Sequence, residues 1–211
     1  MKQVRLDQLA DSIFAIVMTI LVFEIRVPEF YGFASNNDLI NSLIKLLPVF
    51  ISYLLGFSLL FTYWRSQHFV ASILAKNIDT KFTNLNAIFF FFIGLVPFSS
   101  HLLGKYSYSE VAIIFFALNI ILIGLSLFRM RQYAIKSTTI ENMPFTKIEN
   151  EHANMHIWFP VVVSIIAVIV SFYSINIALL FFTLAILFNL SDRSTKYSFW
   201  LLNLFLKKPL K

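Results

Sequence analysis

The sequence predicts an all-α integral membrane protein with six transmembrane helices. Apolar residues make up 58% of the 211 residues and charged residues only 13%, whereas about 25% of a typical soluble domain is charged. Six apolar runs lie between short polar stretches, and several approach the roughly 20 residues that a helix needs to cross a bilayer. The whole chain, 1–211, is therefore expected to form a single six-helix transmembrane domain.

The apolar runs predict helices at about 6–26, 39–67, 82–103, 110–128, 157–173 and 175–190. Pro28 ends the first, and Pro48 and Pro97 are expected to bend the second and third, because proline removes a helical hydrogen bond. The charged and polar stretch 129–156 predicts a solvent-facing cytoplasmic loop with room for an amphipathic helix. The basic, aromatic tail 191–211 is expected to lie on the membrane surface.

Positive charges predict the orientation of this layout. All lysines and arginines except Arg26, Lys45 and Lys105 fall on the side of the N-terminus, so both termini are expected to be cytoplasmic. The net charge of +6 therefore points to anionic lipid, and no nucleic-acid partner is expected. The absence of cysteine from the sequence excludes disulfides, thiolate metal sites and cysteine nucleophiles.

The first apolar run, from Arg5 to Pro28, carries the main candidate site. Asp11 stands at its head, and a carboxylate so close to hydrocarbon is a functional-site hypothesis by default. Residues at three- and four-residue steps share one helical face, which either lines a pore or lies against lipid and other helices. These residues are Ser12, Ile16, Thr19, Ile20 and Phe23.

Trp64 and His68 lie four residues apart at the end of the second predicted helix. They are placed to meet Arg5 and Asp11 at the base of the first helix and to anchor it. The alternative is an interfacial tryptophan beside a solvated histidine, which is common at helix ends. The spacing alone does not choose between the two.

Evidence for an enzyme or a metal site is weak. His152 and His156 have the spacing of a zinc pair, but the glutamate placement of a metalloprotease helix is absent and the pair lies in the predicted loop, which favours an interfacial or solvated feature. The sequence shows no glycine-rich phosphate loop and no nucleophile elbow. No catalytic residue, metal or cofactor is therefore predicted.

The start of the chain resembles the TMEM175-type potassium channel family. The family pattern Arg-x-x-x-Phe-Ser-Asp is matched by Arg5 and Asp11, while Leu9 and Ala10 depart from it. Similarity continues in Trp64 and His68, and in Asn84-Leu85-Asn86 leading into the stretch from Phe89 to Pro97. The resemblance covers the first half of the chain, and the second half resembles the family in hydropathy. The departures predict a hydrogen-bonded network at the helix base that is thinner or differently built.

The resemblance implies a potassium-permeable channel built as a homotetramer in the plasma membrane of a prokaryote. It places Ile16, Ile20 and Phe23 at a hydrophobic constriction, with Thr19 one step to the side and Ser12 on the same face, and it favours the anchoring network of Asp11, Trp64, His68 and Arg5. K+ would be the permeant ion among the monovalent cations. No Thr-Val-Gly-Tyr-Gly filter is present in the sequence, so selectivity by a carbonyl ring is not expected.

Two other functions compete with this reading. The first is a proton-leak or carrier-type transporter, in which Asp11 and His68 would titrate during transport. The second is a membrane-embedded enzyme or metal protein that uses His152 and His156.

Overall fold

The computed structural model describes residues 3–30, 32, 35–75, 77–141 and 147–190, and its regular elements are helices. They are α1 (Gln3–Ile20), the 3-10 helix η1 (Leu21–Glu24), α2 (Asn36–Lys45), α3 (Leu47–His68), the π-helix η2 (Phe69–Leu74), α4 (Thr80–Gly94), α5 (Val96–Lys105), α6 (Glu110–Lys136), α7 (Lys147–Ser171) and α8 (Ile175–Leu190).

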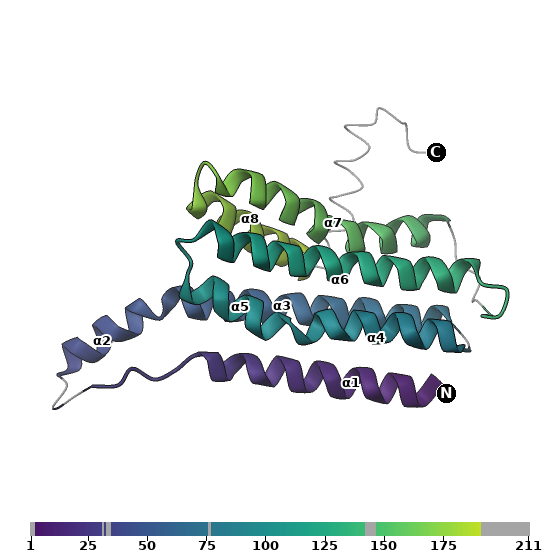
Figure 1. Cartoon of the computed structure of the whole chain (residues 1–211), viewed down its shortest axis with the longest axis horizontal. Coiled ribbons are helices and arrows are strands. Elements are labelled where there is room, and N and C mark those ends of the chain that lie inside the picture. Colours follow the sequence, from purple (N-terminus) through teal and green to yellow (C-terminus); the bar gives the residue numbers. More distant parts are fainter. Residues whose placement is uncertain (1–2, 31, 33–34, 76, 142–146, 191–211) are drawn as a thin grey trace.

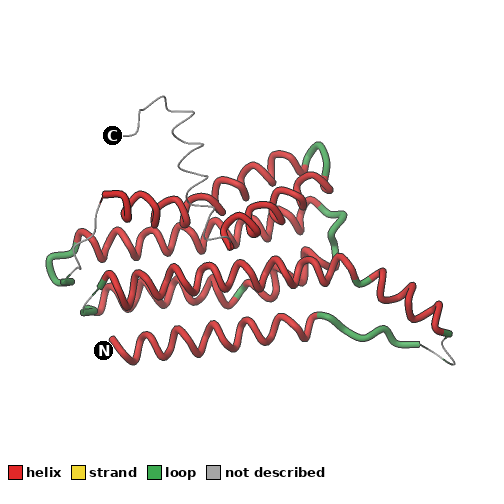
Figure 2. The backbone as a smooth tube through the Cα atoms, turned by 180° about the vertical axis from the view of Figure 1, so that it is seen from behind, coloured by secondary structure: helices red, strands yellow, loops and turns green. Residues whose placement is uncertain are grey.

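The helices form an elongated bundle (Figure 1, Figure 2). The first helix α1 lies along one edge of it, α7 and α8 lie along the opposite edge, and α3 to α6 fill the space between them (Figure 1). Within the bundle α1 packs against α3 and α4, while α6 packs against α4 and α7. Among the described residues, one long side of α1 is therefore left without a packed neighbour.

Four helical stretches are long and apolar enough to cross a membrane: Gln3–Glu24, Leu47–Ser72, Thr80–Lys105 and Glu110–Lys136. Two more, Ile157–Ser171 and Ile175–Leu184, are apolar but shorter within the described residues. The chain is thus an all-helical, multi-pass membrane protein, and the predicted count of six spanning helices stays a prediction.

Two helices that were predicted as continuous are each divided near a proline. The predicted helix 39–67 consists of α2 and α3, separated at Leu46 with Pro48 in the first turn of α3. The predicted helix 82–103 consists of α4 and α5, separated at Leu95 with Pro97 in the first turn of α5. Proline has no N–H and its ring displaces the preceding turn, so each helix restarts there.

The short helix α2 projects from the end of the bundle (Figure 1). It begins with a capping box, in which Ser35 and Asp38 bond each other's backbone N–H groups, an arrangement that satisfies two otherwise unpaired donors. None of its ten residues is buried. Its start is therefore fixed by local capping rather than by packing.

Most of the stretch 129–156, predicted as a cytoplasmic loop with room for a helix, is helical, and its cytoplasmic placement stays a prediction. Helix α6 continues to Lys136, and α7 already begins at Lys147. Hydropathy detects only the apolar part of a helix. A helix can continue beyond that part, because arginine, lysine, glutamate and glutamine are also good helix formers. Arg131 and Ala134 on the extension of α6 are buried, so tertiary packing supports it. The predicted tail 191–211 lies outside the described residues.

Hydrogen bonds between buried polar side chains join the central helices. Gln67 of α3 donates to the side-chain carbonyl of Asn86 on α4 (3.2 Å), and Asn119 of α6 donates to Ser99 of α5 (3.0 Å). The Ser100 hydroxyl donates to the backbone carbonyl of Ser52 (2.6 Å). Such bonds hold helices together in lipid, where burial of apolar surface between helices provides little drive.

Candidate functional site

The first helical stretch, α1 together with η1, has two distinct faces. Its buried face is a stripe at three- and four-residue steps that packs into the core, and it consists of Leu6, Ala10, Phe14, Val17 and Leu21. The opposite face carries all five predicted pore residues, and every one of them is exposed: Ser12, Ile16, Thr19, Ile20 and Phe23. The exposed fractions of 57% at Ile16 and 75% at Phe23 leave large apolar side chains to be covered by lipid, by another chain or by a dewetted pore.

The two hydroxyl groups on the exposed face are turned back toward their own helix. Ser12 donates to the carbonyl of Gln8 (2.7 Å), and Thr19 lies within hydrogen-bond distance of the carbonyls of Ala15 (2.9 Å) and Ile16 (2.8 Å). Because the hydroxyl proton is used within the helix, the lone pairs of each oxygen remain available on the exposed face. This arrangement presents acceptors, which suit a cation.

The structure brings together three of the four predicted anchors of this helix. The Trp64 indole Nε1 donates to Oδ1 of Asp11 at 2.8 Å, and the Trp64 ring stacks on the His68 ring with centroids 6.1 Å apart. His68 in turn shares a hydrogen bond with the Ser72 hydroxyl (3.3 Å). Arg5 is exposed, and among the described residues no bond joins it to this group.

A contact at the other end of the candidate pore helix was missed by sequence reasoning. Glu24, the last residue of η1, places Oε2 2.9 Å from Nδ1 of His101 on α5. Each side chain is about one third exposed. Neither residue stands in a recognisable spacing with the other, so only the fold brings them together. The candidate pore helix is therefore held near both of its ends.

A carboxylate outside the membrane-spanning helices organises the loop between η2 and α4. Oδ1 of Asp79 accepts from the backbone N–H of Phe82 (2.7 Å) and caps α4. Oδ2 accepts from the Thr139 hydroxyl (2.7 Å) and from the Tyr133 hydroxyl. The bond from Tyr133, followed by those from Phe82 and Thr139, lowers the pKa of Asp79 despite the opposing effect of its burial.

This lowered pKa predicts an acid-sensitive contribution to stability. A carboxyl group whose folded-state pKa lies below its unfolded value of about 3.9 stabilises the fold above that pH and loses the contribution as the pH falls further. We expect the melting temperature of Asp79→Asn to lie below that of the wild type at pH 7, and the difference to shrink toward pH 3. Thermal melts in detergent measure this, with Glu29→Gln as the charge-matched control. A difference that stays constant with pH would contradict the assignment.

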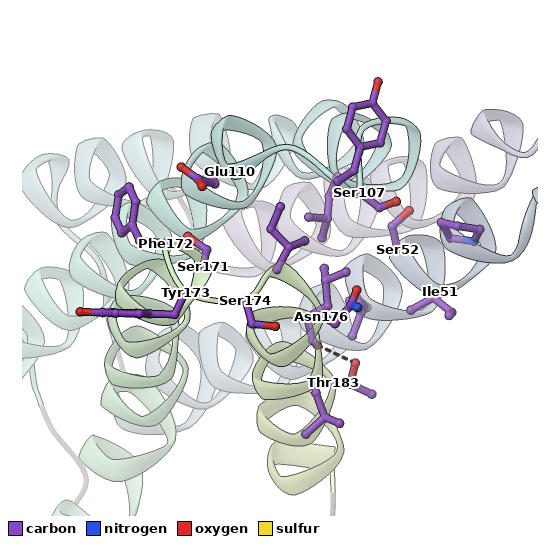
Figure 3. A pocket seen from close by; sticks show the side chains of 17 residues that line it. Ile51, Ser52, Ser107, Glu110, Ser171, Phe172, Tyr173, Ser174, Asn176 and Thr183 are labelled. Atoms are coloured by element: carbon purple, nitrogen blue, oxygen red, sulfur yellow. Dashed lines mark hydrogen bonds between the residues drawn. The ribbon is translucent and has the colours of Figure 1, made fainter.

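A pocket of about 730 Å³ lies away from α1, between α3 and the hairpin of α7 and α8 (Figure 3). It is lined by α3, the turn between α5 and α6, and the hairpin of α7 and α8, with Ser52, Glu110 and Asn176 among its polar residues. Glu110 is the only charged residue among the described residues that line it, and none of those residues belongs to α1. The pocket is thus separate from the exposed face of the candidate pore helix.

The candidate metal ligands are not tested by the structure. The side chains of His152 and His156 lie outside the described residues. Among the residues that are described, no group of three or more histidine, aspartate or glutamate side chains is placed to hold a metal ion.

The fold and this site together define a multi-pass membrane protein whose first helix presents an apolar face with hydroxyl acceptors. The family model described as the endosomal/lysosomal potassium channel TMEM175 matches residues 5–97, the part of the chain that holds that helix and its anchors. The resemblance predicted from the sequence is therefore confirmed over this stretch.

Comparison with individual proteins extends the similarity beyond this stretch. A potassium channel of Chamaesiphon minutus is 31% identical over 102 residues, which cover 48% of this chain and 49% of the relative. A potassium channel of Chryseobacterium sp. is 27% identical over 183 residues, which cover 84% and 82%. The match to the first of these, like that to a potassium channel of Streptomyces collinus, thus spans about half the length of the relative.

A solved structure shares the fold of nearly the whole chain. The crystal structure of a lysosomal potassium-selective channel TMEM175 homolog from Chamaesiphon minutus matches with a TM-score of 0.74 and 26% identity. The match covers 91% of this chain and 97% of that chain. The second half, in which sequence analysis found a resemblance only in hydropathy, thus also takes part in the shared fold.

Proposed function

We propose that the protein is a potassium-permeable cation channel in which ions move passively along the exposed face of α1. The observation that carries this proposal is the division of α1 and η1 into a face buried in the core and a face that exposes Ile16, Ile20 and Phe23. The names of the relatives, each called a potassium channel, support the same class of function.

Conduction would be controlled by a hydrophobic constriction. A narrow apolar ring is costly for a hydrated ion and conducts when it widens and becomes wet. Ile16, Ile20 and Phe23 would form this ring, while the oxygens of Ser12 and Thr19 would contact a partly dehydrated cation. Selectivity then depends on the width of the ring and on partial dehydration, and K+ is a permeant ion rather than a resident cofactor.

One subunit cannot enclose such a path, because α1 lies at the edge of the bundle (Figure 1). Closed symmetry around an axis would bring the exposed faces of several copies of α1 together. We propose a homotetramer in the plasma membrane of a prokaryote, with both termini cytoplasmic, as the family resemblance and the distribution of positive charge favour. The hydrogen bond between Trp64 and Asp11 would hold each α1 in its orientation.

A second candidate is a proton-leak or carrier-type transporter. It is favoured by the exposure of Asp11 and by its contact, through Trp64, with the imidazole of His68. In that case both groups would change protonation during transport. The family description names a channel rather than an enzyme, so a membrane enzyme receives no support.

Flux from potassium-loaded proteoliposomes tests the two candidates. A channel gives potassium efflux that depends on an added proton carrier and discriminates against a large organic cation. Asp11→Ala is expected to lower this efflux about tenfold, since it removes a hydrogen bond to a charged group worth roughly 1.5–3 kcal/mol. Asp7→Ala, a change of the same kind one turn earlier, is the control. Acidification without any proton carrier and without potassium flux would support the transporter instead.

A further inference from the structure

The first residue of α1 is tied to a distant part of the chain. The side-chain amide Nε2 of Gln3 donates to the backbone carbonyl of Ala71 at 2.7 Å and to that of Ala75 at 2.8 Å. Ala71 lies within η2, and Ala75 is the residue at which η2 ends. One amide group therefore bridges the start of the candidate pore helix and the end of the second membrane span.

The two carbonyls lie at the end of a helix, where a hydrogen-bond donor has to come from outside that helix. The last carbonyls of a helix have no partner within the helix, and both Ala71 and Ala75 have an exposed fraction of 0%. A buried carbonyl without a donor is costly, so the bonds from Gln3 have a definite physical reason. The amide NH2 of glutamine has two hydrogens to give, which matches the two acceptors.

The segment that follows η2 is held from its other side by the end of α6 and by the residues that follow that helix. The Asn77 side chain donates to the carbonyl of Thr139 (2.9 Å) and accepts from the backbone N–H of Glu141 (2.7 Å). Asp79 accepts from Thr139 and Tyr133. Gln3 thus connects α1 to a loop that is bonded to the end of α6 and to the residues after it.

Hydrogen bonds can fix the rotation of a helix about its axis, which apolar packing alone leaves free. Burial of the stripe from Leu6 to Leu21 is non-directional, whereas hydrogen bonds depend strongly on angle. Gln3 and Asp11 each bond a residue outside α1. The two residues lie about 12 Å apart along the helix axis, at 1.5 Å per residue. Two such points restrict rotation of α1 about its own axis, and hence the direction in which Ile16 points.

We infer that Gln3 is a positioning residue of the candidate pore, which relays the position of Ala75 and of residues 77–79 to the exposed face of α1. The inference rests on the proposed channel function. It assigns a role to a residue that lies before the stretch matched by the family model, and it makes the contact between this loop and the end of α6 a place where conduction can be changed from the cytoplasmic side.

Variants of Gln3 separate the loss of its hydrogen bonds from a change of size. Gln3→Glu has nearly the same shape but no donor in its ionised form, and Gln3→Lys keeps donors within reach of the carbonyls. In single-channel recordings, loss of one or two such bonds is expected to change the ratio of open to closed time about three- to tenfold in Gln3→Glu. Gln3→Lys should restore most of the wild-type ratio, and Gln132→Leu on α6 is a control at the same end of the bundle.

A double variant tests the relay itself. Asp79→Asn keeps the acceptor that caps α4 but replaces Oδ2, the acceptor for Tyr133 and Thr139, with a donor. If both residues act through one connection, the double variant with Gln3→Glu will shift the open-to-closed ratio no more than the larger single change does. Independent, multiplicative shifts, or a Gln3→Glu protein with wild-type gating and only a lower melting temperature, would overturn the inference.

The hydrogen bonds between Gln3 and the end of η2 can also be tested by an experiment that does not depend on ion conduction. Hydrogen–deuterium exchange of the peptide that covers 3–10 is expected to be faster in Gln3→Glu than in the wild type and unchanged in Gln132→Leu. If the wild type carries no potassium flux, the proposed channel function fails on its own, and the hydrogen bonds are judged by exchange alone. Unchanged exchange in Gln3→Glu would show that these bonds do not hold α1.

Discussion

Replacement of Ile16 by asparagine is expected to raise the potassium conductance of the channel about tenfold, which corresponds to a barrier lower by about 1.4 kcal/mol. Ile16 has an exposed fraction of 57% on the free face of α1, and in the proposed tetramer four copies would form an apolar ring. Asparagine offers water a hydrogen-bond donor and acceptor, so the ring stays wet at a smaller width. Discrimination between potassium and sodium should fall at the same time, because cations then pass with more of their hydration shell.

Single-channel conductance and reversal potentials in mixed potassium and sodium solutions measure both effects. Ile165→Asn is the matched control, since Ile165 on α7 has an exposed fraction of 46% at the opposite edge of the bundle. The conservative change Ile16→Val should keep the wild-type selectivity. Conductance and selectivity that do not change in Ile16→Asn would remove α1 from the conduction path.

The second large effect is expected at Gly104 of α5. Of the glycines in α3 and α5, Gly104 leaves the least room for a side chain between these two helices. A Cβ atom at this position would lie 2.3 Å from Oγ of Ser52 and 2.8 Å from Cα of Val49. The second contact is with backbone, so the helices have to separate to admit a methyl group. Overpacking of this kind costs about 1–3 kcal/mol, and we expect Gly104→Ala to lower the melting temperature by roughly 3–10 °C.

Gly94 provides a matched control in the adjoining helix. No heavy atom lies within 4 Å of a Cβ atom built there, and alanine is the better helix former by up to about 1 kcal/mol. Gly94→Ala should therefore melt at the wild-type temperature or slightly above it. Equal melting temperatures for the two variants in detergent would show that the close approach of α5 to α3 is not a constraint on the fold.

Local patterns were sufficient for the class of protein and for the two faces of α1. Composition and apolar runs predicted a helical membrane protein, and three- and four-residue steps placed Ser12, Ile16, Thr19, Ile20 and Phe23 on one face, which the structure leaves exposed. These inferences succeed because hydropathy and helical periodicity depend on neighbouring residues only.

Helix boundaries were predicted less well where two local signals compete. Pro48 and Pro97 were expected to bend helices and instead mark points at which a helix ends and the next begins. In the stretch 129–156, charge indicated a loop, while helix propensity and burial of Arg131 and Ala134 continue α6 to Lys136. The strength of such packing is not visible in a window of sequence.

The meeting of residues from different helices became visible only in the folded chain. Sequence patterns alone indicated a membrane-embedded, helical chain, the exposed face of α1 and, through Arg5 and Asp11, the family to compare it with. They left the partner of Asp11 open, and they contained no sign that Gln3 reaches Ala71 and Ala75 or that Glu24 meets His101. Each of these contacts depends on the relative rotation and height of two packed helices, which the whole core sets and no local pattern encodes.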